Sequence, residues 1–347
     1  MPIVSNHAVT AVDIAKSVFE VAVSIQPGRV SERRTLSRSK FLMFFATRPA
    51  TTVVTEACGS SHHWARQLQQ LGHRVVLLPP SLVNPYVVRS KTNRTDAKGI
   101  LEAYRNEEIH PVPVKSIYQH TLMSLHRARS AWMHARTARI NTVRGLLREL
   151  GVFLPTGAKK VVPLVHEYIG DAESDCPEAL RPTLHAMCRE IRDLETSIRD
   201  TEAQLERLAK DLPIVAQLRS IPGIGLLTAT ALIAFVGDVR RFKNARRFAS
   251  YLGLTPKEFS TGKKRRLGRI SKQGNTYLRH LLIHGARSLL RAAATKKETD
   301  HLRTWALAKA ASRGPHKGAT AVANKLARIV WAVWSKNDAY RSLPTAA

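Results

Sequence analysis

Acidic residues are scarce in this chain of 347 residues, which contains 26 Asp and Glu against 55 Lys and Arg. A folded protein with a formal net charge of +29 repels itself unless a polyanion is its normal partner. Nucleic acid is the usual polyanion for such a protein, so we expect it to bind DNA or RNA. A small ribosomal-type binder and a membrane-surface protein are the alternatives.

Cysteine and long apolar runs are also scarce. The three cysteines, Cys58, Cys176 and Cys188, have neither the spacing of a metal site nor a disulfide framework, which favours a reducing cytoplasm as the location. The first ten residues lack the charged-then-apolar pattern of a signal peptide. No run of 18 or more uninterrupted apolar residues occurs, so we expect no membrane partner.

The order of apolar runs predicts an α/β domain over residues 1–110. Short runs rich in β-branched residues alternate with segments of helical pattern. We expect strands at residues 9–14, 18–25, 29–36, 51–55 and 73–78, and helices at 38–46, 61–71 and 94–107. Three successive strands followed by helix–strand alternation indicate a mixed sheet flanked by helices.

Residues 111–212 are predicted to form a helical assembly region. One long helix with a basic face covers residues 115–150. Farther on, apolar residues recur at alternating steps of three and four, as in a heptad seam: Leu184, Met187, Ile191, Leu194, Ile198, Thr201, Leu205, Leu208 and Leu212. This seam packs either within its own chain or as a coiled coil between protomers of a homo-oligomer, a dimer or a tetramer.

Three carboxylates in the first domain have the order expected of a metal site. Asp13 lies inside an apolar strand, where burial is costly unless the acid pairs or binds a cation. Glu56 ends a later strand, and Asp96 lies near the start of a helix. Acids so placed can converge at one sheet edge and bind Mg²⁺, which prefers oxygen ligands and activates phosphoryl transfer.

The order of these acids resembles the ribonuclease-H-like, or RuvC-like, fold. More specifically, the chain is similar to the DEDD transposases of bacterial insertion sequences, which are relatives of the Piv-type pilin invertases. The resemblance extends over nearly the whole chain and rests on four motifs: Ala11–Lys16, Thr55–Gly59, Lys91–Gly99 (KTNRTDAKG) and Val112–Ser116. It implies a Mg²⁺-dependent site that cuts and rejoins donor and target DNA, and a guide RNA encoded by the element.

One position departs from the family pattern. The last acidic motif of the family has two aspartates three residues apart, whereas this chain has Asn93 before Asp96. An Asn side chain offers a carbonyl oxygen to Mg²⁺ but brings no negative charge. The site therefore has three carboxylates, with Asn93 as a neutral member, and the substitution either weakens metal binding or identifies an inactive relative.

Residues 213–340 are predicted to form an all-α, basic C-terminal domain. It begins with a sequence that has the spacing of a helix-hairpin-helix, Leu218–Gly225 followed by Ala229. In such a module, the turn made here by Gly223 and Gly225 offers backbone N–H groups to a phosphate at a helix N-terminus. An ordinary helix–helix turn is the alternative interpretation.

A dense basic stretch interrupts the predicted helices of this domain at residues 260–274. Between Arg240 and Lys297 there are seventeen Lys or Arg and one acid, Glu258. We expect nucleic-acid phosphates to contact the basic residues Lys263, Lys264, Arg265, Arg266, Arg269 and Lys272.

The stretch resembles the C-terminal domain of the same family, where a serine in a Ser/Thr-Gly context is implied to attack DNA and form a phosphoserine. Ser260 is the best match, and Thr261 and Ser271 are its rivals. A serine hydroxyl needs an activator, and the metal cluster of the first domain would help to deprotonate it. Nearby Lys and Arg would stabilise the charge on the phosphate.

The sequence thus favours a site-specific DNA recombinase of an insertion sequence. A structure-selective nuclease, similar to a junction resolvase, would need the carboxylates but not Ser260. An inactive nucleic-acid-binding relative would need neither Asp13 nor Ser260.

Overall fold

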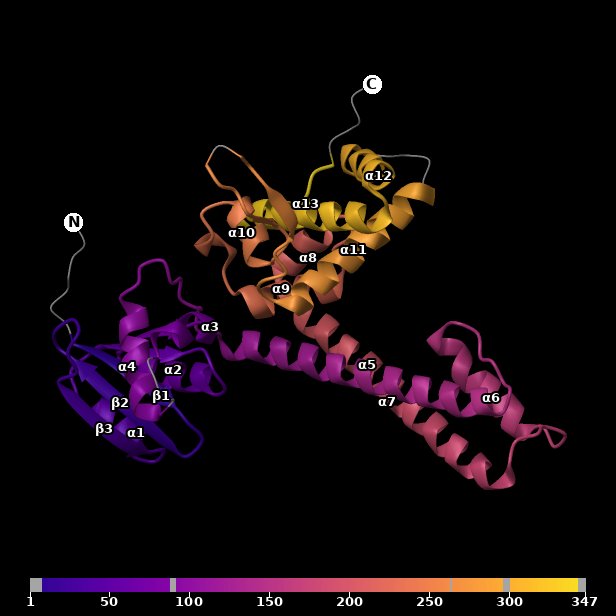
Figure 1. Ribbon diagram of the computed structural model, residues 1–347, viewed down its shortest axis with the longest axis horizontal. Helices are drawn as coiled ribbons and strands as arrows, with labels where there is room; N and C mark the ends of the chain where they lie inside the picture. The colour runs from indigo at the N-terminus through magenta and orange to yellow at the C-terminus, as the bar shows by residue number, and fades with distance from the viewer. Residues whose placement is uncertain (1–7, 88–91, 263, 296–299, 343–347) are drawn as a thin grey trace. The chain divides into compact units, whose positions relative to one another are not determined.

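The computed structural model describes residues 8–87, 92–262, 264–295 and 300–342 (Figure 1). The chain separates into two compact units, Met1–Ile117 and Tyr118–Ala347. In the part of the chain so described, every helix is too short or too polar to cross a membrane. The three-part division expected from the sequence stays a prediction.

The first unit contains the mixed five-stranded sheet that the sequence predicts. Its strands are β1 (Val9–Ile14), β2 (Val18–Ser24), β3 (Glu32–Ser37), β4 (Thr52–Glu56) and β5 (Arg74–Leu78), in the spatial order β3-β2-β1-β4-β5. Strand β1 pairs antiparallel with β2 and parallel with β4, which in turn pairs parallel with β5. Strand β3 begins three residues later than predicted, because a turn closed by the Gln26–Arg29 bridge precedes it, with Gly28 at φ +84°.

Helices cover both faces of this sheet. Helix α4 (Asn93–Tyr104) contributes Ala97 and Ile100 to a buried cluster with Ala11, Ala22 and Val54. The opposite face packs Val12, Phe19 and Val21 against α1 (Phe41–Ala46) and α2 (Ser61–Gln70), whose anchors are Phe41, Phe45, Trp64 and Leu68. The first unit is completed by α3 (Pro80–Val83) and the short 3-10 helix Asn84–Tyr86.

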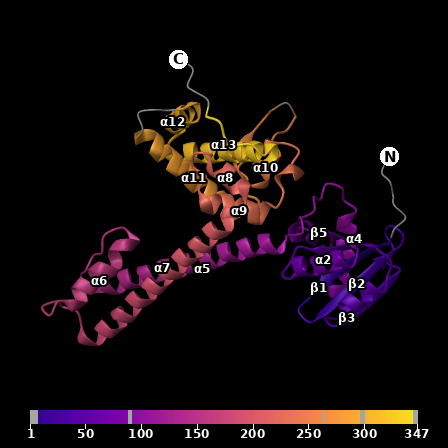
Figure 2. The same ribbon diagram turned by 180° about the vertical axis from the view of Figure 1, so that it is seen from behind.

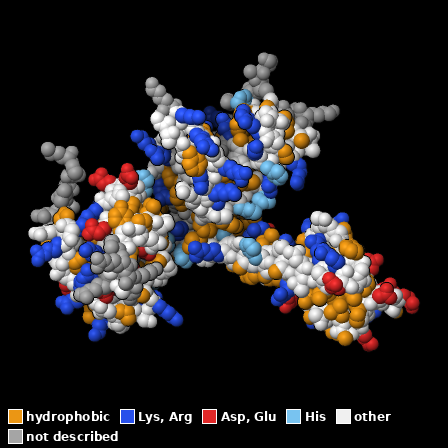
Figure 3. Space-filling model, viewed as in Figure 1, with side chains coloured by type: hydrophobic (Ala, Val, Ile, Leu, Met, Phe, Trp, Pro, Cys, Tyr) orange, Lys and Arg blue, Asp and Glu red, His pale blue; other side chains and the backbone are white. Residues whose placement is uncertain are grey.

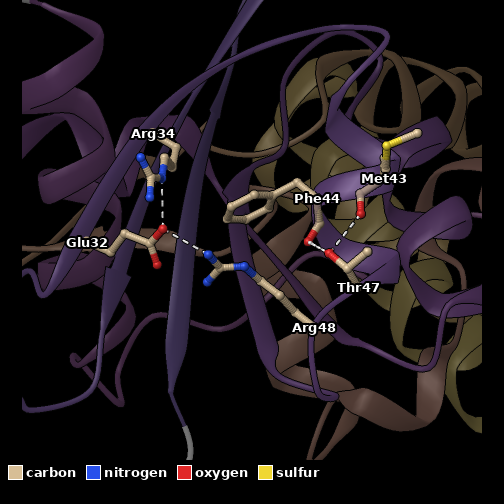
Figure 4. Close-up of polar contacts among 6 residues, drawn as sticks. All are labelled: Glu32, Arg34, Met43, Phe44, Thr47 and Arg48. Atoms are coloured by element: carbon tan, nitrogen blue, oxygen red, sulfur yellow. Dashed lines mark hydrogen bonds and ion pairs between the residues drawn. The ribbon is translucent and has the colours of Figure 1, made fainter.

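Polar contacts tie the edge strand β3 to the end of α1 (Figure 4). Glu32 accepts hydrogen bonds from Arg34 Nε at 2.9 Å and from Arg48 Nη2 at 2.8 Å. The Arg48 guanidinium also lies 4.0 Å from the centre of the Phe44 ring. Although partial burial opposes it, these two hydrogen bonds hold the pKa of Glu32 below its ordinary value. The charged cluster therefore adds polar contacts between the sheet edge and the end of α1.

The second unit begins with two long helices, α5 (Ile117–Glu149) and α7 (Arg181–Lys210), which lie side by side in both views (Figures 1 and 2). Three ion pairs join them: Arg129–Glu202, Arg136–Glu195 and Arg139–Glu190. Near the tip, α6 (Val161–Gly170) joins Ile140, Val143, Leu184 and Ile191 in one buried cluster. The heptad seam of α7 thus packs, at least in part, within its own chain, and the coiled coil between protomers stays a prediction.

The remainder is mostly helical rather than all-α, which corrects the sequence prediction. Its helices are α8 (Pro213–Arg219), α9 (Leu226–Val236), α10 (Ala245–Tyr251), α11 (Thr276–Thr295), α12 (His301–Arg313) and α13 (Pro315–Lys336), and 3-10 turns cover Ala158–Lys160, Glu178–Leu180 and Val239–Arg241. The basic stretch forms an antiparallel ribbon of β6 (Pro256–Glu258) and β7 (Leu267–Ile270). This stretch has few apolar residues, and strand pairing satisfies its backbone.

Candidate functional site

Asp13 and Glu56 lie at neighbouring strand ends on one face of the sheet. Strands β1 and β4 run parallel with Ala11 opposite Val54 and Val12 opposite Thr55, so Asp13 and Glu56 are next in register. Side chains two residues apart in a strand share a face. Since Ala11 and Val54 face α4, both acids belong to the face that α4 covers.

Asp96 lies in the first turn of that covering helix. A capping box fixes the turn: Thr95 N donates to Thr92 Oγ1, and Thr92 N donates to Thr95 Oγ1. Asp96 Oδ1 is buried without a hydrogen-bond partner among the described residues. A buried carboxylate oxygen without a partner is costly, and a bound cation would satisfy it. Asn93 is the first residue of α4, but its side chain lies outside the described part.

Sequence reasoning missed a further acid on this face, Glu20. It lies directly opposite Asp13 in the antiparallel pair of β1 and β2, so the two side chains share a face. Glu20 is 9% exposed and accepts a 2.7 Å hydrogen bond from Thr35 Oγ1. An acid inside the otherwise apolar run Val18–Val23 was the available signal.

The electrostatics of the strand ends agree with this grouping. Burial raises the pKa of the Cys58 thiol, and the negative charges of Glu56 and Asp13 raise it further. The two carboxylates therefore act on the same point just beyond β4. In the described part of the chain, however, no three His, Cys, Asp or Glu side chains are grouped closely enough to hold a metal ion.

The Val112–Ser116 motif brings a buried lysine beside the first turn of α2. Val112 N donates to Leu77 O on β5 at 2.7 Å, which fixes the segment along that strand. Lys115 is 9% exposed, and its Nζ lies 3.3 Å from His62 Nε2. Arg66 Nη1 donates to Lys115 O at 2.8 Å. A motif to which sequence reasoning gave no role thus supplies a cation next to the turn that follows Glu56.

Ser260 lies in the turn of the β6–β7 ribbon, away from the carboxylate domain in sequence. Its side chain is exposed, and its Oγ donates a 2.8 Å hydrogen bond to Glu258 Oε1. The same oxygen accepts from Arg266 N at 3.2 Å. Arg265 Nε lies 3.5 Å from the same Glu258 oxygen. The serine is therefore accessible, held in place by two contacts, and hydrogen-bonded to a carboxylate.

The two rivals of Ser260 have different surroundings. Thr261 pairs its backbone with Lys264 through hydrogen bonds of 3.2 and 3.1 Å at the tip of the ribbon. Ser271 lies at the base of the ribbon, half-buried, where its N donates to Thr255 O and its Oγ accepts weakly from Gln273 N at 3.4 Å. Among the described residues, Ser260 is the one of these three whose hydroxyl donates a hydrogen bond to a carboxylate.

Two family models match separate parts of the chain. The model for DEDD transposases of the IS110 type matches residues 10–152, and the model for the transposase family IS116/IS110/IS902 matches residues 215–301. A "Probable family 20 transposase" of Pseudomonas aeruginosa is 40% identical over 97% of this chain and 99% of its own length. The transposase for insertion sequence element IS1111A of Coxiella burnetii is 35% identical over 96% of this chain and 91% of its own length. The chain belongs to the IS110/IS116/IS902 transposase family.

In this IS110-family transposase, the predicted helix-hairpin-helix is a turn between α8 and α9. Gly223 has φ +87°, and a Cβ there would lie 2.7 Å from Gly285 O on α11. The absence of a side chain at Gly223 therefore permits close packing of the turn on α11. A Cβ on Gly225, the N-cap of α9, would meet nothing within 4 Å, so packing does not require glycine there. The phosphate contact expected at this turn stays a prediction.

The basic residues predicted to bind nucleic acid in the transposase lie along the ribbon. Lys264, Arg265, Arg266 and Arg269 are exposed on its turn and on β7, and Lys272 is exposed at its base with φ +56°. Lys263 lies outside the described residues. Lys and Arg side chains also cover much of the C-terminal helices on the face shown in Figure 3, whereas acidic side chains gather at the tip of the α5–α7 hairpin.

Proposed function

We propose that this insertion-sequence transposase recombines DNA site-specifically through a covalent bond between Ser260 and a DNA phosphate. The observation that carries the proposal is the exposed Ser260 hydroxyl, which donates to Glu258 at 2.8 Å within the most basic stretch of the chain. Hydroxyl nucleophiles need a neighbouring base, and a carboxylate acceptor supplies one. The cationic side chains around it stabilise the negative charge that develops on phosphate.

The reaction at this serine is a phosphoryl transfer that balances without a redox partner. A bond forms between Ser260 Oγ and phosphorus while the bond from phosphorus to the leaving sugar oxygen breaks. The serine proton moves to Glu258, its hydrogen-bond acceptor, and the leaving oxygen takes a proton from water. Rejoining is the reverse transfer, in which a DNA hydroxyl displaces the serine.

The N-terminal domain is proposed to be ribonuclease-H-like with a Mg²⁺ site. The sheet has the strand order β3-β2-β1-β4-β5. Strand β2 is antiparallel to β1, whereas β4 and β5 are parallel to β1, and this arrangement supports the fold. The oxygen donors of Asp13, Glu56 and Asp96 suit a hard divalent cation, and a cation would satisfy the buried Asp96 oxygen that lacks a hydrogen-bond partner in the described structure. Bound Mg²⁺ would neutralise phosphate charge, while Asn93 would add a neutral oxygen.

Two partners complete the proposal. An element-encoded RNA would guide donor and target DNA to the protein, and the net charge of +29 is compatible with binding two polyanions. A homo-oligomer, a dimer or a tetramer, would bring the carboxylates and Ser260 together on DNA, from the same protomer or from different ones. The guide RNA is implied by the family resemblance, and the homo-oligomer is inferred from the heptad seam of α7.

The decisive experiment is a search for a protein–DNA adduct. The protein is incubated with Mg²⁺, DNA from the ends of the element and RNA transcribed beside its gene, and the products are separated on a denaturing gel before and after protease treatment. Ser260→Ala, Thr261→Ala and Ser271→Ala are compared with the unchanged chain, and Asn93→Asp is run alongside. We expect a protease-sensitive adduct that only Ser260→Ala abolishes.

Each other outcome selects a different function. Loss of the adduct in Thr261→Ala alone, or in Ser271→Ala alone, would identify that residue as the nucleophile in place of Ser260. Free cleaved DNA without any adduct, retained in Ser260→Ala, would identify a nuclease that uses only the carboxylates. An adduct that appears only with Asn93→Asp would show that this chain is a disabled relative, and omission of the RNA tests the guide directly.

A further inference from the structure

A basic cleft lies beside the ribbon that bears Ser260. It has a volume of about 710 Å³ and is bounded by α10, α13 and the β6–β7 ribbon. Four arginines line it: Arg246 and Arg247 from α10, Arg265 from the ribbon and Arg328 from α13. The one acid in the lining is Glu258, so the charge of the lining is +4 − 1 = +3.

Three of these arginines are unpaired with any acid in the described part of the chain. Arg246, Arg247 and Arg328 are exposed and make no ion pair with any acid that the structure describes. Elsewhere in the second unit, arginines such as Arg129 and Arg219 are paired with glutamates. Cations gathered in a concave site repel one another, and a bound polyanion relieves that repulsion.

The walls of the cleft are fixed by packing. Asn324 Nδ2 on α13 donates to Leu254 O at 3.0 Å, which holds α13 against the segment that enters the ribbon. Trp331 Nε1 donates to Phe242 O at 3.2 Å, just before α10. Phe248 of α10 is fully buried in the same core as Val322 and Leu326 of α13. The arginines therefore extend from elements whose relative positions are set before any ligand binds.

The cleft and the candidate nucleophile share a residue. Glu258 lines the cleft, accepts the hydrogen bond of Ser260 and lies 3.5 Å from the guanidinium of Arg265. A strand whose phosphates bind the arginines would therefore run past the Ser260 hydroxyl. Arginine suits this task because its planar fork donates two parallel hydrogen bonds to phosphate.

We propose that this arginine cleft binds the backbone phosphates of the DNA strand that Ser260 attacks. The choice of the attacked strand rests on the proposed function, whereas the binding of phosphodiesters rests on the cleft itself. The contacts are independent of base sequence, because arginine–phosphate bonds carry no base information. The target sequence would then be selected by contacts outside the cleft.

The test measures how salt weakens DNA binding when the cleft loses its charge. The triple variant Arg246→Gln/Arg247→Gln/Arg328→Gln is placed in the Ser260→Ala full-length protein, which forms no Ser260 adduct. A matched control removes three exposed cations from α11 and α12 instead: Arg291→Gln/Lys309→Gln/Arg313→Gln. Fluorescence anisotropy with labelled element-end DNA gives the dissociation constant between about 50 and 200 mM salt.

We expect the cleft variant to reduce the slope of log affinity against log salt by up to about 3, since each lost phosphate contact removes about one. The control variant should change this slope much less. Replacing the same three arginines with lysine should restore most of the slope, because charge is kept. Circular dichroism melting of each variant shows that the domain remains folded.

Several results would overturn the inference or limit it. Equal slopes for the cleft and control variants remove the cleft from DNA binding, even if the unchanged chain forms a serine adduct. Loss of affinity for RNA of the same sequence, with DNA binding unaffected, reassigns the cleft to the RNA. A reduced DNA slope in a protein that never forms an adduct would keep the phosphate site and reject the serine reaction, so the two failures are distinguishable.

Discussion

At the scale of single residues, Glu258 is the base that we propose activates Ser260. Glu258→Gln keeps the shape of the side chain but removes the carboxylate that accepts the serine proton. We expect adduct formation to slow by about 10²-fold or more, because the amide cannot accept the serine proton. The measurement is the single-turnover rate of adduct formation.

A matched control for this change is Glu206→Gln. Glu206 is also a partly exposed glutamate that accepts a hydrogen bond from an arginine, Arg219 Nη1 at 2.7 Å, but it lies on α7. Its replacement should leave the rate unchanged within about twofold, as for an ordinary surface substitution. An equal loss in both variants would mean that charge removal in general, and not the Ser260 contact, slows the reaction.

The buried histidine of α5 predicts how the C-terminal domain responds to acid. His126 is 1% exposed and hydrogen-bonds to Tyr277 Oη and Thr230 Oγ1, both at 3.0 Å. Burial, with a smaller contribution from the positive charge of Arg129, lowers the pKa of His126 from 6.5 to about 4. The neutral form thus stabilises the fold above about pH 6.5, and this stability, about 3 kcal/mol, is lost as pH falls toward 4.

Comparison with His126→Gln isolates this contribution. Gln keeps hydrogen-bonding capacity but does not titrate, so its cost is independent of pH. Hydrogen exchange of α9 should show the unchanged chain losing protection, relative to the variant, between about pH 6.5 and 4. A constant difference across this range would show that His126 is not buried as a neutral base.

Sequence reasoning identified residues that differ in character from their neighbours in the sequence. It missed residues whose role depends on contacts between distant parts of the chain. Asp13 and Glu56 stand out because an acid in or beside an apolar strand is costly unless it has a partner. Glu20 has the same signal but was passed over, since its place opposite Asp13 follows from the strand register. Arg246 and Arg328 are 82 residues apart in the sequence, and only the packing of α10 on α13 brings them to one cleft.

At the scale of elements, the turn between α8 and α9 contains two glycines with different surroundings. Gly223 packs closely against α11, whereas the space around Gly225 is open. Gly223→Ala forces a Cβ to within 2.7 Å of Gly285 O at a residue with φ +87°, so either the turn or α11 must move. We expect a loss of more than about 1 kcal/mol in unfolding free energy. Gly225→Ala meets no atom within 4 Å and should cost less than about 1 kcal/mol.

These two variants also test the phosphate contact at the turn. Denaturant unfolding gives the stability of each, and DNA affinity is measured under conditions where both are folded. Gly223→Ala should be the less stable protein. If the two lose equal stability, the close approach of the turn to α11 is not what requires glycine there.

Helices and strands were predictable where the spacing of apolar residues and the length of the segment both indicated the same element. The strand runs Val9–Ile14 and Thr52–Glu56 are short and apolar, and the long helices carry apolar residues at helical spacing. The β6–β7 ribbon was not predicted, because Lys257–Arg269 has few apolar residues and its strands are defined by backbone pairing. The α7 seam was visible in the sequence, but its contacts with α5 were not, since one apolar stripe fits a partner helix of either chain.

At the scale of the whole molecule, charge and metal should act on different steps. The net charge of +29 is enough to bind nucleic acid without a metal, since counterion release drives such binding. Chemistry, in contrast, is proposed to need the cation held by Asp13, Glu56 and Asp96. We therefore expect chelation of divalent ions to abolish adduct formation while DNA affinity at constant ionic strength changes by less than about threefold.

A change at Asn93 should alter the Mg²⁺ concentration that the reaction needs. Restoring a carboxylate with Asn93→Asp adds one negative charge to a site that already contains the unpartnered oxygen of Asp96, and a cation is attracted more strongly by each added charge. The Mg²⁺ concentration for half-maximal adduct formation should fall by about tenfold, the equivalent of about 1.4 kcal/mol. Asp13→Asn should raise that concentration or abolish the reaction. Metal binding measured by calorimetry, without DNA, must change in the same order, since a shift in activity alone would place Asn93 in contact with substrate rather than with the ion.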